Sequence, residues 1–559
     1  MPVRAIARSL TTASVVAALL GAVPPTAAAQ ELDAAAIDAV FADIDADGPG
    51  CAVGVVQDRE LAYTGGYGSA NLDYGLPITP TSNFYLGSVS KQFTAAAIAH
   101  AVRAGHLSLD DPIRKWFPEI PEYERPVTVR HLVHHTSGVR DYLGLWNLSG
   151  WRVDDIHSDE ETLALLARQQ TGNFPAGEEY LYSNGGYFLL SELIERATDL
   201  TLREYLHEHF FRPLGMERSR FGDDRVEVID ERVVGYRATD DGYGMFHAWN
   251  YDKVGAGGMY SSIEDLARWD RNWYTEEVGG PGFTEQLRER GVLNDGTEID
   301  YAFGLSHGEY RGLETVAHGG ALAGFRSSLV RFPNQETTVV VLCNFPTSDP
   351  ESRAERVADV VLASELAPVA EEEDDMEAAP EAVELTAEEL DAFVGHWRAS
   401  MGIEVEIVRE GEDLFFLQSG NRSPVLVAGP DRILLTRSDV DMRLADLVDG
   451  RYQSMSVTQG GNEFTAERIM PGDGPADYGG LHGAYYSEEL DVTYTIFTED
   501  DELMVDMAGR SSELRNVGED RFATPFSTLL RFERETGAVT GFTVDAGRVR
   551  GIAFERTGG

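Results

Sequence analysis

Tyr85-Leu86-Gly87-Ser88-Val89-Ser90-Lys91-Gln92-Phe93 is the stretch on which the rest of the chain depends. An alanine-rich run follows it and stops at Gly105, a residue suited to a left-handed C-terminal cap. Alanine is the best helix former, so we predict a helix over residues 88–104 that opens at Ser88. Residues three apart share a helix face, which brings the amine of Lys91 within reach of the Ser88 hydroxyl.

A Ser-x-x-Lys spacing alone is a weak signal, because a helix-capping serine followed by a surface lysine gives the same pattern. The rarity of lysine strengthens it. Lys91, Lys115 and Lys253 are the only lysines, and arginine supplies the rest of the 46 basic residues. An ammonium can lose its proton when it is desolvated, whereas a guanidinium stays charged, so lysine has a chemical task here that arginine cannot perform.

Composition limits the classes of function. The 559 residues, 43% of them hydrophobic, are enough for at least two folding units. A formal net charge of −48 disfavours binding to nucleic acid or anionic lipid, and together with the scarcity of lysine it indicates an acidic, salt-adapted surface. Two cysteines are too few for a disulfide framework.

The N-terminus has the layout of a secretory signal peptide over residues 1–29: two arginines, an apolar run, then Thr26-Ala27-Ala28-Ala29. A buried N-terminal helix is the alternative, but Pro24 and Pro25 end the run. No later apolar run approaches the roughly 20 residues of a membrane span. We therefore expect a secreted or periplasmic protein with no membrane span.

Strands are predicted at both ends of the region that follows. Residues 51–56 and 61–64 read as a hairpin, and residues 314–321, 324–332 and 337–344 as three consecutive strands. Gly319 and Gly320 interrupt the first of these three, which marks a place where a ligand or another backbone comes close. Free amides on such an edge strand can pair with an extended peptide. We expect one domain over residues 30–367, with helices between the strands.

Polar side chains within this domain are candidates for a site. Tyr182 and Asn184 lie in a loop that enters a helix, where catalytic groups tend to sit, although an aromatic core residue is the alternative for Tyr182. Three histidines, His131, His134 and His135, invite a zinc interpretation. No acidic or cysteine ligand lies close in the sequence, so structural histidines on a helix ending at Gly138 are the better interpretation, and residues 255–262 read as a flexible loop.

The C-terminal third is expected to be separate. Residues 368–385 form an acidic linker, residues 386–470 a first β unit, residues 471–480 a second linker, and residues 481–559 a second β unit. The β units repeat each other, since the segment around Gly395 and Trp397 matches that around Gly483 and Tyr485. Short alternating strands predict small antiparallel barrels.

Three motifs in order, Ser88-x-x-Lys91, Tyr182-Ser183-Asn184 and His318-Gly319-Gly320, resemble the penicillin-recognising serine hydrolases. The likeness is to the branch that holds class C β-lactamases, D-Ala-D-Ala carboxypeptidases, esterases and D-aminopeptidases. It implies an α+β, β-lactamase/transpeptidase-like domain of antiparallel sheet and helical lobe, with the site between them. The two trailing units resemble the lipocalin-like barrels of D-aminopeptidase. In that fold the first and last strands are neighbours, which would allow Cys51 and Cys343 to pair.

The same motifs imply an acyl-enzyme mechanism without cofactor or metal. Ser88 would be the nucleophile, activated by Lys91 or Tyr182, and the choice between these two bases stays open. Asn184 would hold Lys91 and the substrate amide. The backbone amides of Ser88 and Ala321 would form the oxyanion hole. Gly319 and Gly320 would line the substrate.

One departure from the family pattern concerns His318, which stands where β-lactamases and carboxypeptidases usually have lysine. Histidine carries a full charge only near or below its pKa of about 6.5, so the demand for an anionic C-terminus is weakened. We expect a D-stereospecific aminopeptidase or amidase acting on a small peptide or amide. An esterase, a carboxypeptidase or β-lactamase-like enzyme, and a catalytically idle protein that binds ligand or cell wall are the alternatives, and the oligomeric state stays open.

Overall fold

The structure is a computed structural model. It describes residues 32–558, apart from 153, 247–249, 369–382, 384, 400–403, 419–420, 436–439, 460–461, 470–477, 519 and 526–527. The predicted signal peptide and most of the two predicted linkers lie outside the described residues. No helix in the described part of the chain is long and apolar enough to cross a membrane.

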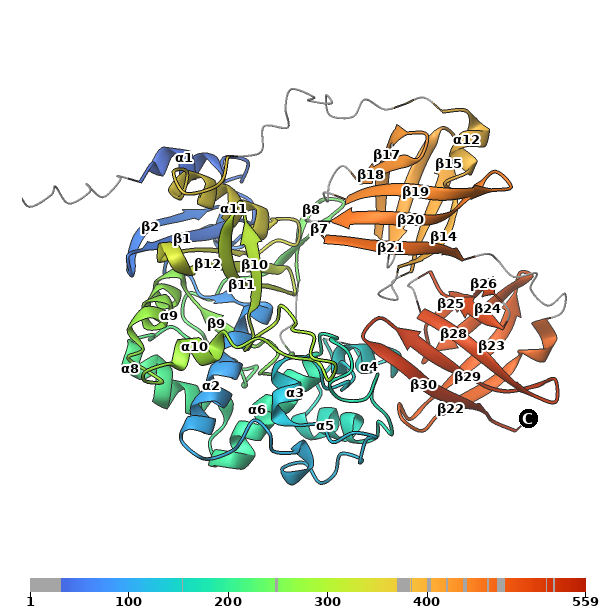
Figure 1. The fold of residues 1–559 in the computed structure, drawn as a ribbon, viewed down its shortest axis with the longest axis horizontal. Coiled ribbons are helices and arrows are strands. Elements are labelled where there is room, and N and C mark those ends of the chain that lie inside the picture. The colour runs from blue at the N-terminus through green and yellow to red at the C-terminus, as the bar shows by residue number, and fades with distance from the viewer. Residues whose placement is uncertain are drawn as a thin grey trace, which may run out of the picture.

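A six-stranded antiparallel sheet forms one half of the N-terminal domain (Figure 1). The first and last strands of the domain are neighbours at its centre, and Cys51 and Cys343 face each other there and form a disulfide. The sheet order is β10-β11-β12-β13-β1-β2, with bounds β1 Cys51–Gln57, β2 Glu60–Tyr67, β10 Ser306–Tyr310, β11 Leu313–Leu322, β12 Phe325–Phe332 and β13 Thr337–Cys343.

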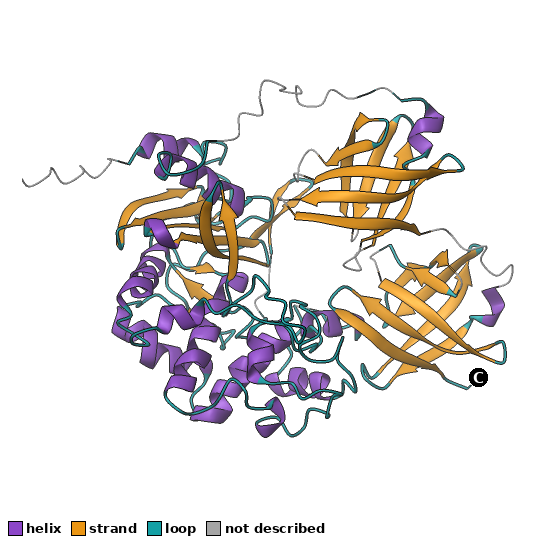
Figure 2. Ribbon diagram, in the orientation of Figure 1, coloured by secondary structure: helices purple, strands orange, loops and turns teal. Residues whose placement is uncertain are grey.

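Helices make up the other half of this domain, as the purple lobe of Figure 2 shows. At its centre α2 is buried on nearly every side, because its alanines let neighbouring elements approach closely. The helices of the domain are α1 Ala34–Ala39, α2 Lys91–Arg103, α3 Val129–Val133, α4 Tyr142–Leu148, α5 Asp159–Ala167, α6 Asn184–Thr198, α7 Leu202–Leu206, α8 Arg212–Leu214, α9 Ile263–Thr275, α10 Phe283–Leu287 and α11 Pro350–Val361.

Short elements complete the domain. Helices α1 and α11 cover one face of the sheet through a shared apolar core, and α9 packs on the other face. The remaining pieces are the 3₁₀ turns Gly87–Ser90, Ile113–Lys115 and Pro333–Gln335, the π turn His207–Phe211, and β3 Ser69–Asn71, β4 Leu76–Pro77, β5 Phe84–Tyr85, β6 Arg220–Phe221, β7 Tyr236–Thr239, β8 Gly242–Met245 and β9 Met259–Ser261.

Three local predictions need correction. The helix predicted over residues 88–104 begins at Lys91, because Ser88 lies in a preceding 3₁₀ turn. Gly319 and Gly320 do not interrupt their strand, since β11 pairs with β12 on both sides of them. The loop predicted over residues 255–262 contains β9, which pairs with β5 and β6.

The first β unit is a closed eight-stranded barrel preceded by α12. Its core is formed by inward-facing residues such as Trp397 and Met442. The elements are α12 Ala387–Asp391, β14 Gly395–Ala399, β15 Glu404–Glu410, β16 Asp413–Gln418, β17 Asn421–Gly429, β18 Arg432–Leu435, β19 Val440–Val448, β20 Arg451–Gln459 and β21 Asn462–Ile469.

The second β unit is a nine-stranded antiparallel sheet in the order β25-β24-β23-β22-β30-β29-β28-β27-β26. The 3₁₀ turn Tyr478–Gly480 precedes it. Its strands are β22 Gly483–Ser487, β23 Val492–Glu499, β24 Glu502–Met507, β25 Ser511–Glu513, β26 Arg515–Gly518, β27 Arg521–Ala523, β28 Thr528–Glu535, β29 Ala538–Ala546 and β30 Val549–Arg556.

The two β units share a structural detail at corresponding places. In the first unit, Arg468 donates to the carbonyl of Ala392 and lies over the ring of Trp397, beside Gly395. In the second, Arg556 lies over the ring of Tyr485, beside Gly483. The same combination of glycine, buried aromatic ring and arginine recurs, which supports duplication of one unit.

The second β unit docks on the helical lobe, with β30 drawn beside α4 in Figure 1. Arg140 is fully buried in this interface and donates to Glu489 at 2.7 Å and to the Arg550 carbonyl at 3.1 Å. Tyr494 donates to the Leu148 carbonyl at 2.7 Å. Residues of both parts belong to one continuous apolar core, so the unit is packed against the lobe that carries Ser88.

Candidate active site

Ser88 lies in a 3₁₀ turn that packs backbone to backbone against β11. Gly87 has φ +54°, and a Cβ there would lie 2.6 Å from the backbone nitrogen of Ala321. A Cβ on Gly320 would lie 2.9 Å from the backbone nitrogen of Ser88 and 2.1 Å from the Leu86 carbonyl. Only glycine permits this approach from both sides, so the predicted oxyanion-hole amides of Ser88 and Ala321 come from two adjoining backbones.

Lys91 is buried directly behind the Ser88 hydroxyl. Its Nζ lies 3.2 Å from Ser88 Oγ, 2.9 Å from Asn184 Oδ1 and 2.6 Å from the Ala256 carbonyl. Burial lowers the pKa of Lys91 well below its ordinary value, and the charge of Arg548 lowers it further, whereas Asp141 opposes the shift. A neutral amine donates to the two carbonyl oxygens and keeps its lone pair for the hydroxyl proton of Ser88.

Asn184 begins α6 and is held in place by Asp141. Its backbone nitrogen and its Nδ2 both donate to Asp141 Oδ2, at 2.9 and 2.8 Å, so its Oδ1 faces Lys91. Asp141 in turn caps α4 by accepting from the backbone of Leu143 at 2.9 Å. The buried Asp141 carboxylate therefore links the first residues of α4 and α6, and through Asn184 it is connected to the Lys91 amine.

Tyr182 completes the group from the loop before α6. Lys91 Nζ lies 4.6 Å from its ring centroid. Burial raises the pKa of Tyr182 well above its ordinary value, while the nearby Ser88 hydroxyl and the charge of Arg548 oppose the shift. The His135 ring lies 4.2 Å from the Tyr182 ring and supports it.

His318 lies on β11 and is neutral at physiological pH. Nδ1 donates to the Gly319 carbonyl at 2.6 Å, and Nε2 accepts from the Tyr301 hydroxyl at 3.1 Å, which assigns the Nδ1 tautomer. Burial lowers the pKa of His318 to about 4, although the hydrogen bond to the Gly319 carbonyl opposes the shift. The imidazole therefore offers no positive charge to a substrate at pH 7.

A pocket of about 350 Å³ opens beside these groups. It is lined by Tyr180, Tyr182, Tyr301, His318 and Gly319, together with residues of β12 and α11. Strand β10 pairs with β11 only as far as Ala317, so β11 presents a free edge from His318 onward in the described sheet. This free edge is where an extended substrate can form backbone hydrogen bonds.

The structure brings together all the predicted side chains, Ser88, Lys91, Tyr182, Asn184 and His318. Three further groups contact them that the sequence did not predict: Asp141, Tyr301 and Arg548. Asp141 precedes a helix and has the signature of an N-cap, so its position carried a local signal. Tyr301 and Arg548 reach the site through long-range contacts that no sequence spacing indicates.

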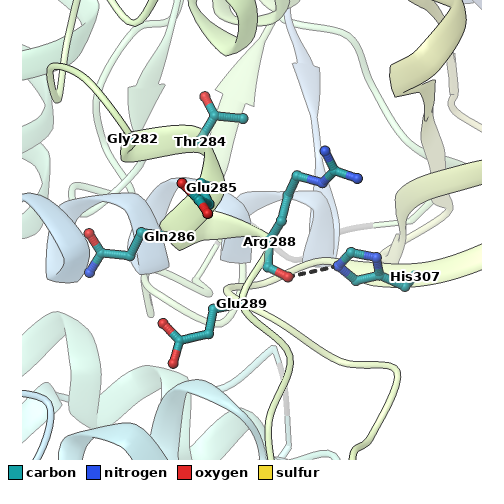
Figure 3. A pocket seen from close by; sticks show the side chains of 7 residues that line it. All are labelled: Gly282, Thr284, Glu285, Gln286, Arg288, Glu289 and His307. Carbon is teal, nitrogen blue, oxygen red and sulfur yellow. Dashed lines mark hydrogen bonds between the residues drawn. The ribbon is translucent and has the colours of Figure 1, made fainter.

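Besides the group around Ser88, the domain contains the three histidines of the zinc interpretation and a second pocket. The three histidines have protein partners: His131 caps α3 with Thr128, His134 hydrogen-bonds the Glu289 carbonyl at 3.1 Å, and His135 accepts from the Ser183 amide at 3.1 Å. The described residues hold no cluster of three or more metal-binding side chains. A pocket of about 740 Å³ around α10 contains none of the predicted site residues (Figure 3).

Comparison with known proteins agrees with this geometry. The sequence model of the β-lactamase family matches residues 37–363, more than half of the chain. The chain belongs to the β-lactamase family. With Ser88 and Lys91 paired as described, this β-lactamase-family protein is a serine hydrolase.

The similarity to individual relatives extends over nearly the whole chain. The D-aminopeptidase of Cereibacter sphaeroides (strain ATCC 17023) is 29% identical over 91% of this chain and 96% of its own length. The D-aminopeptidase of Brucella anthropi is 28% identical over 94% of this chain and 99% of its own length. The resemblance to D-aminopeptidases thus extends beyond the β-lactamase-like domain.

Solved structures show the same fold. The octameric penicillin-binding protein homologue from Pyrococcus abyssi superposes with a TM-score of 0.55 at 24% identity, covering 78% of this chain and all of its own. A D-amino acid amidase from Ochrobactrum anthropi SV3, complexed with D-phenylalanine, gives a TM-score of 0.51 at 20% identity over 59% of this chain and 99% of its own. The predicted α+β architecture with C-terminal antiparallel barrels is confirmed.

Proposed function

We propose that this serine hydrolase is a D-stereospecific aminopeptidase or amidase that works through an acyl-enzyme on Ser88. The observation that carries the proposal is the buried Lys91 amine, 3.2 Å from the Ser88 hydroxyl. Full-length likeness to D-aminopeptidases supports the substrate class.

The proposed mechanism assigns one role to each group. Lys91, neutral because of burial, takes the proton of Ser88 as the hydroxyl attacks the substrate carbonyl. The amides of Ser88 and Ala321 stabilise the resulting oxyanion, each donor contributing about 2.7–4 kcal/mol. The carbon–nitrogen bond then breaks, and the leaving amine takes the proton that Lys91 removed from Ser88, by way of the Tyr182 hydroxyl beside Lys91. Water hydrolyses the ester by the reverse sequence.

The pKa directions favour Lys91 over Tyr182 as the base. The Lys91 pKa is lowered, so its deprotonated form is accessible, whereas the Tyr182 pKa is raised and its phenolate is disfavoured. In this scheme Tyr182 relays a proton instead of removing the first one. Asn184 and Asp141 position the Lys91 amine. The neutral His318 side chain lines the free edge of β11, where the substrate binds.

The test has two parts. Wild-type protein and Ser88→Ala are incubated with a fluorophosphonate probe and the labelled peptide is mapped. Hydrolysis is then compared among D-aminoacyl p-nitroanilides, their L-isomers and the matching p-nitrophenyl esters. We expect labelling at Ser88 and a preference for D-aminoacyl anilides. Labelling elsewhere would refute the nucleophile, and ester hydrolysis without any anilide hydrolysis would favour the esterase alternative.

We also propose that the chain is exported after cleavage near residue 29, since an arginine-containing start, an apolar run and a small-residue site precede the domain. N-terminal sequencing of protein recovered from the native cell envelope or medium tests this. A mature N-terminus at residue 1 would contradict it.

A further inference from the structure

The hairpin between β29 and β30 brings a residue of the second β unit to the active site. The Arg548 carbonyl accepts from Asn173 Nδ2 at 2.9 Å, and the Arg550 amide donates to Asn173 Oδ1 at 2.8 Å. Val549 is fully buried, and it fills the space over Gly144, where a Cβ would lie 2.7 Å from its side chain. These contacts hold the hairpin tip rigidly against the helical lobe.

The Arg548 side chain extends from this tip over Tyr182. Its Cζ lies 4.6 Å from the Tyr182 ring centroid, and Nη1 lies 3.7 Å from Asp141 Oδ2. The side chain is 49% exposed, and its guanidinium makes no hydrogen bond within the part of the chain that the structure describes. Most of its N–H donors therefore remain available for a ligand.

Two other basic groups beside Ser88 are already used. Lys91 is enclosed by Ser88, Asn184 and the Ala256 carbonyl, and the two ring nitrogens of His318 are hydrogen-bonded. The chain as a whole carries a formal charge of −48, which repels an anionic substrate unless a local cation attracts it. A planar guanidinium with free donors matches a carboxylate in bidentate fashion.

We infer that Arg548 binds the carboxylate of the substrate's leaving group, so that the preferred substrates are D-aminoacyl peptides with a free C-terminal carboxylate. This inference rests on the proposed function. The Arg548 guanidinium lies over the Tyr182 ring, and in the proposed mechanism the leaving amine takes its proton at the hydroxyl of that ring. In an amino-acid leaving group a single carbon separates the carboxylate from that amine, which keeps the carboxylate close to a guanidinium over the same ring.

The test compares D-alanyl-D-alanine with its C-terminal amide, using full-length protein and separating the released products by chromatography. We expect the wild type to favour the free acid. Arg548→Gln should lower kcat/KM for the free acid about 10–100-fold more than for the amide, the loss expected for a hydrogen bond between charged groups. Any effect of the lost charge on the pKa of Lys91 falls on both peptides alike. Arg548→Lys should keep part of the preference.

Arg550→Gln is the matched control, because Arg550 is on the same hairpin and its side chain pairs with Glu179 at 3.0 Å. Melting temperatures confirm that each variant is folded. An equal loss on both peptides, or no loss on the free acid, overturns the inference while leaving the proposed function standing if D-aminoacyl anilides are still cleaved. Wild-type protein that cleaves no D-aminoacyl substrate overturns both.

Discussion

At the scale of single residues, the site depends on groups whose surroundings set their protonation. Lys91 is buried among neutral acceptors and His318 is buried between a carbonyl and a phenol. In both cases the side chain loses the solvent that would stabilise its charge, so both pKa values fall. The neutral forms are the ones that the proposed mechanism uses.

Lys91→Arg tests whether the amine must lose a proton. Guanidinium keeps the positive charge but stays protonated, so kcat should fall about 10²–10⁴-fold, the usual contribution of a general base. Lys115→Arg is the control, because Lys115 is an exposed lysine paired with Asp111 at 2.8 Å. Steady-state kinetics on a D-aminoacyl anilide measure the activity of both variants. Wild-type activity in Lys91→Arg would exclude Lys91 as the base.

His318 predicts a dependence of stability on pH. The folded protein holds its pKa near 4 and the unfolded chain near 6.5, so between these values the unfolded chain binds more protons. Stability should therefore be complete above pH 6.5 and fall as the pH drops to 4, by up to about 3 kcal/mol. Urea unfolding across this range should show a shallower decline in His318→Gln than in the wild type.

His106→Gln is the control for that series, since His106 is exposed. It should follow the wild-type profile. If His318→Gln and the wild type decline in parallel, the imidazole does not carry the pH dependence.

At the scale of elements, the most constrained contact is that of the Gly87–Ser90 turn with β11. The Ser327 hydroxyl donates to the Leu86 carbonyl at 2.6 Å and holds β12 to the same turn. Two glycines, one on each backbone, permit the approach. The spacing of the two proposed oxyanion donors is therefore determined by backbone packing.

Gly320→Ala should separate these two elements. Its Cβ would lie 2.1 Å from the Leu86 carbonyl and 2.4 Å from Ser327 Oγ, so β11 must shift. We expect kcat to fall about 10²–10³-fold, as on loss of an oxyanion donor, with a stability cost of about 1–3 kcal/mol. Kinetics and urea unfolding measure the two effects.

Gly429→Ala is the matched control, because Gly429 also lies in a strand but its Cβ would have 3.6 Å to its nearest neighbour. It should leave activity unchanged. Normal activity in Gly320→Ala would show that β11 tolerates the shift and that the Ala321 amide is not required.

Local patterns predicted much of the fold and site. Runs of apolar and β-branched residues predicted β11, β12 and β13, and the three-residue spacing paired Ser88 with Lys91. The patterns failed where tertiary contacts decide. The 3₁₀ turn at Ser88 exists because Gly87 adopts a positive φ against β11, and Arg548 reaches Tyr182 only through docking of a separate unit.

At the scale of the whole molecule, the second β unit and the helical lobe share one apolar core and a buried ion pair. Arg140, adjacent in sequence to Asp141, donates to Glu489 and to the Gln169 side chain at 2.8 Å. The unit is thereby connected to the carboxylate that orients Asn184. Removing the second β unit would therefore lower both the activity and the stability of the protein.

Glu489→Ala should expose this connection. It leaves the buried Arg140 without its carboxylate, which costs about 3–5 kcal/mol in comparable buried pairs. We expect a lower unfolding midpoint and a fall in kcat. Glu488→Ala, at the exposed neighbouring position, should change neither. Unaltered stability in Glu489→Ala would mean that the interface is held by its apolar contacts alone.

The free edge of β11 from His318 onward has a consequence for handedness. A substrate whose backbone is hydrogen-bonded to that edge has its amide plane set by the enzyme. Inverting the α-carbon then exchanges the directions of the hydrogen and the side chain. The side chains of a D-residue and an L-residue bound in this way would therefore point in opposite directions. The enzyme would distinguish the two enantiomers without any group that contacts the α-carbon.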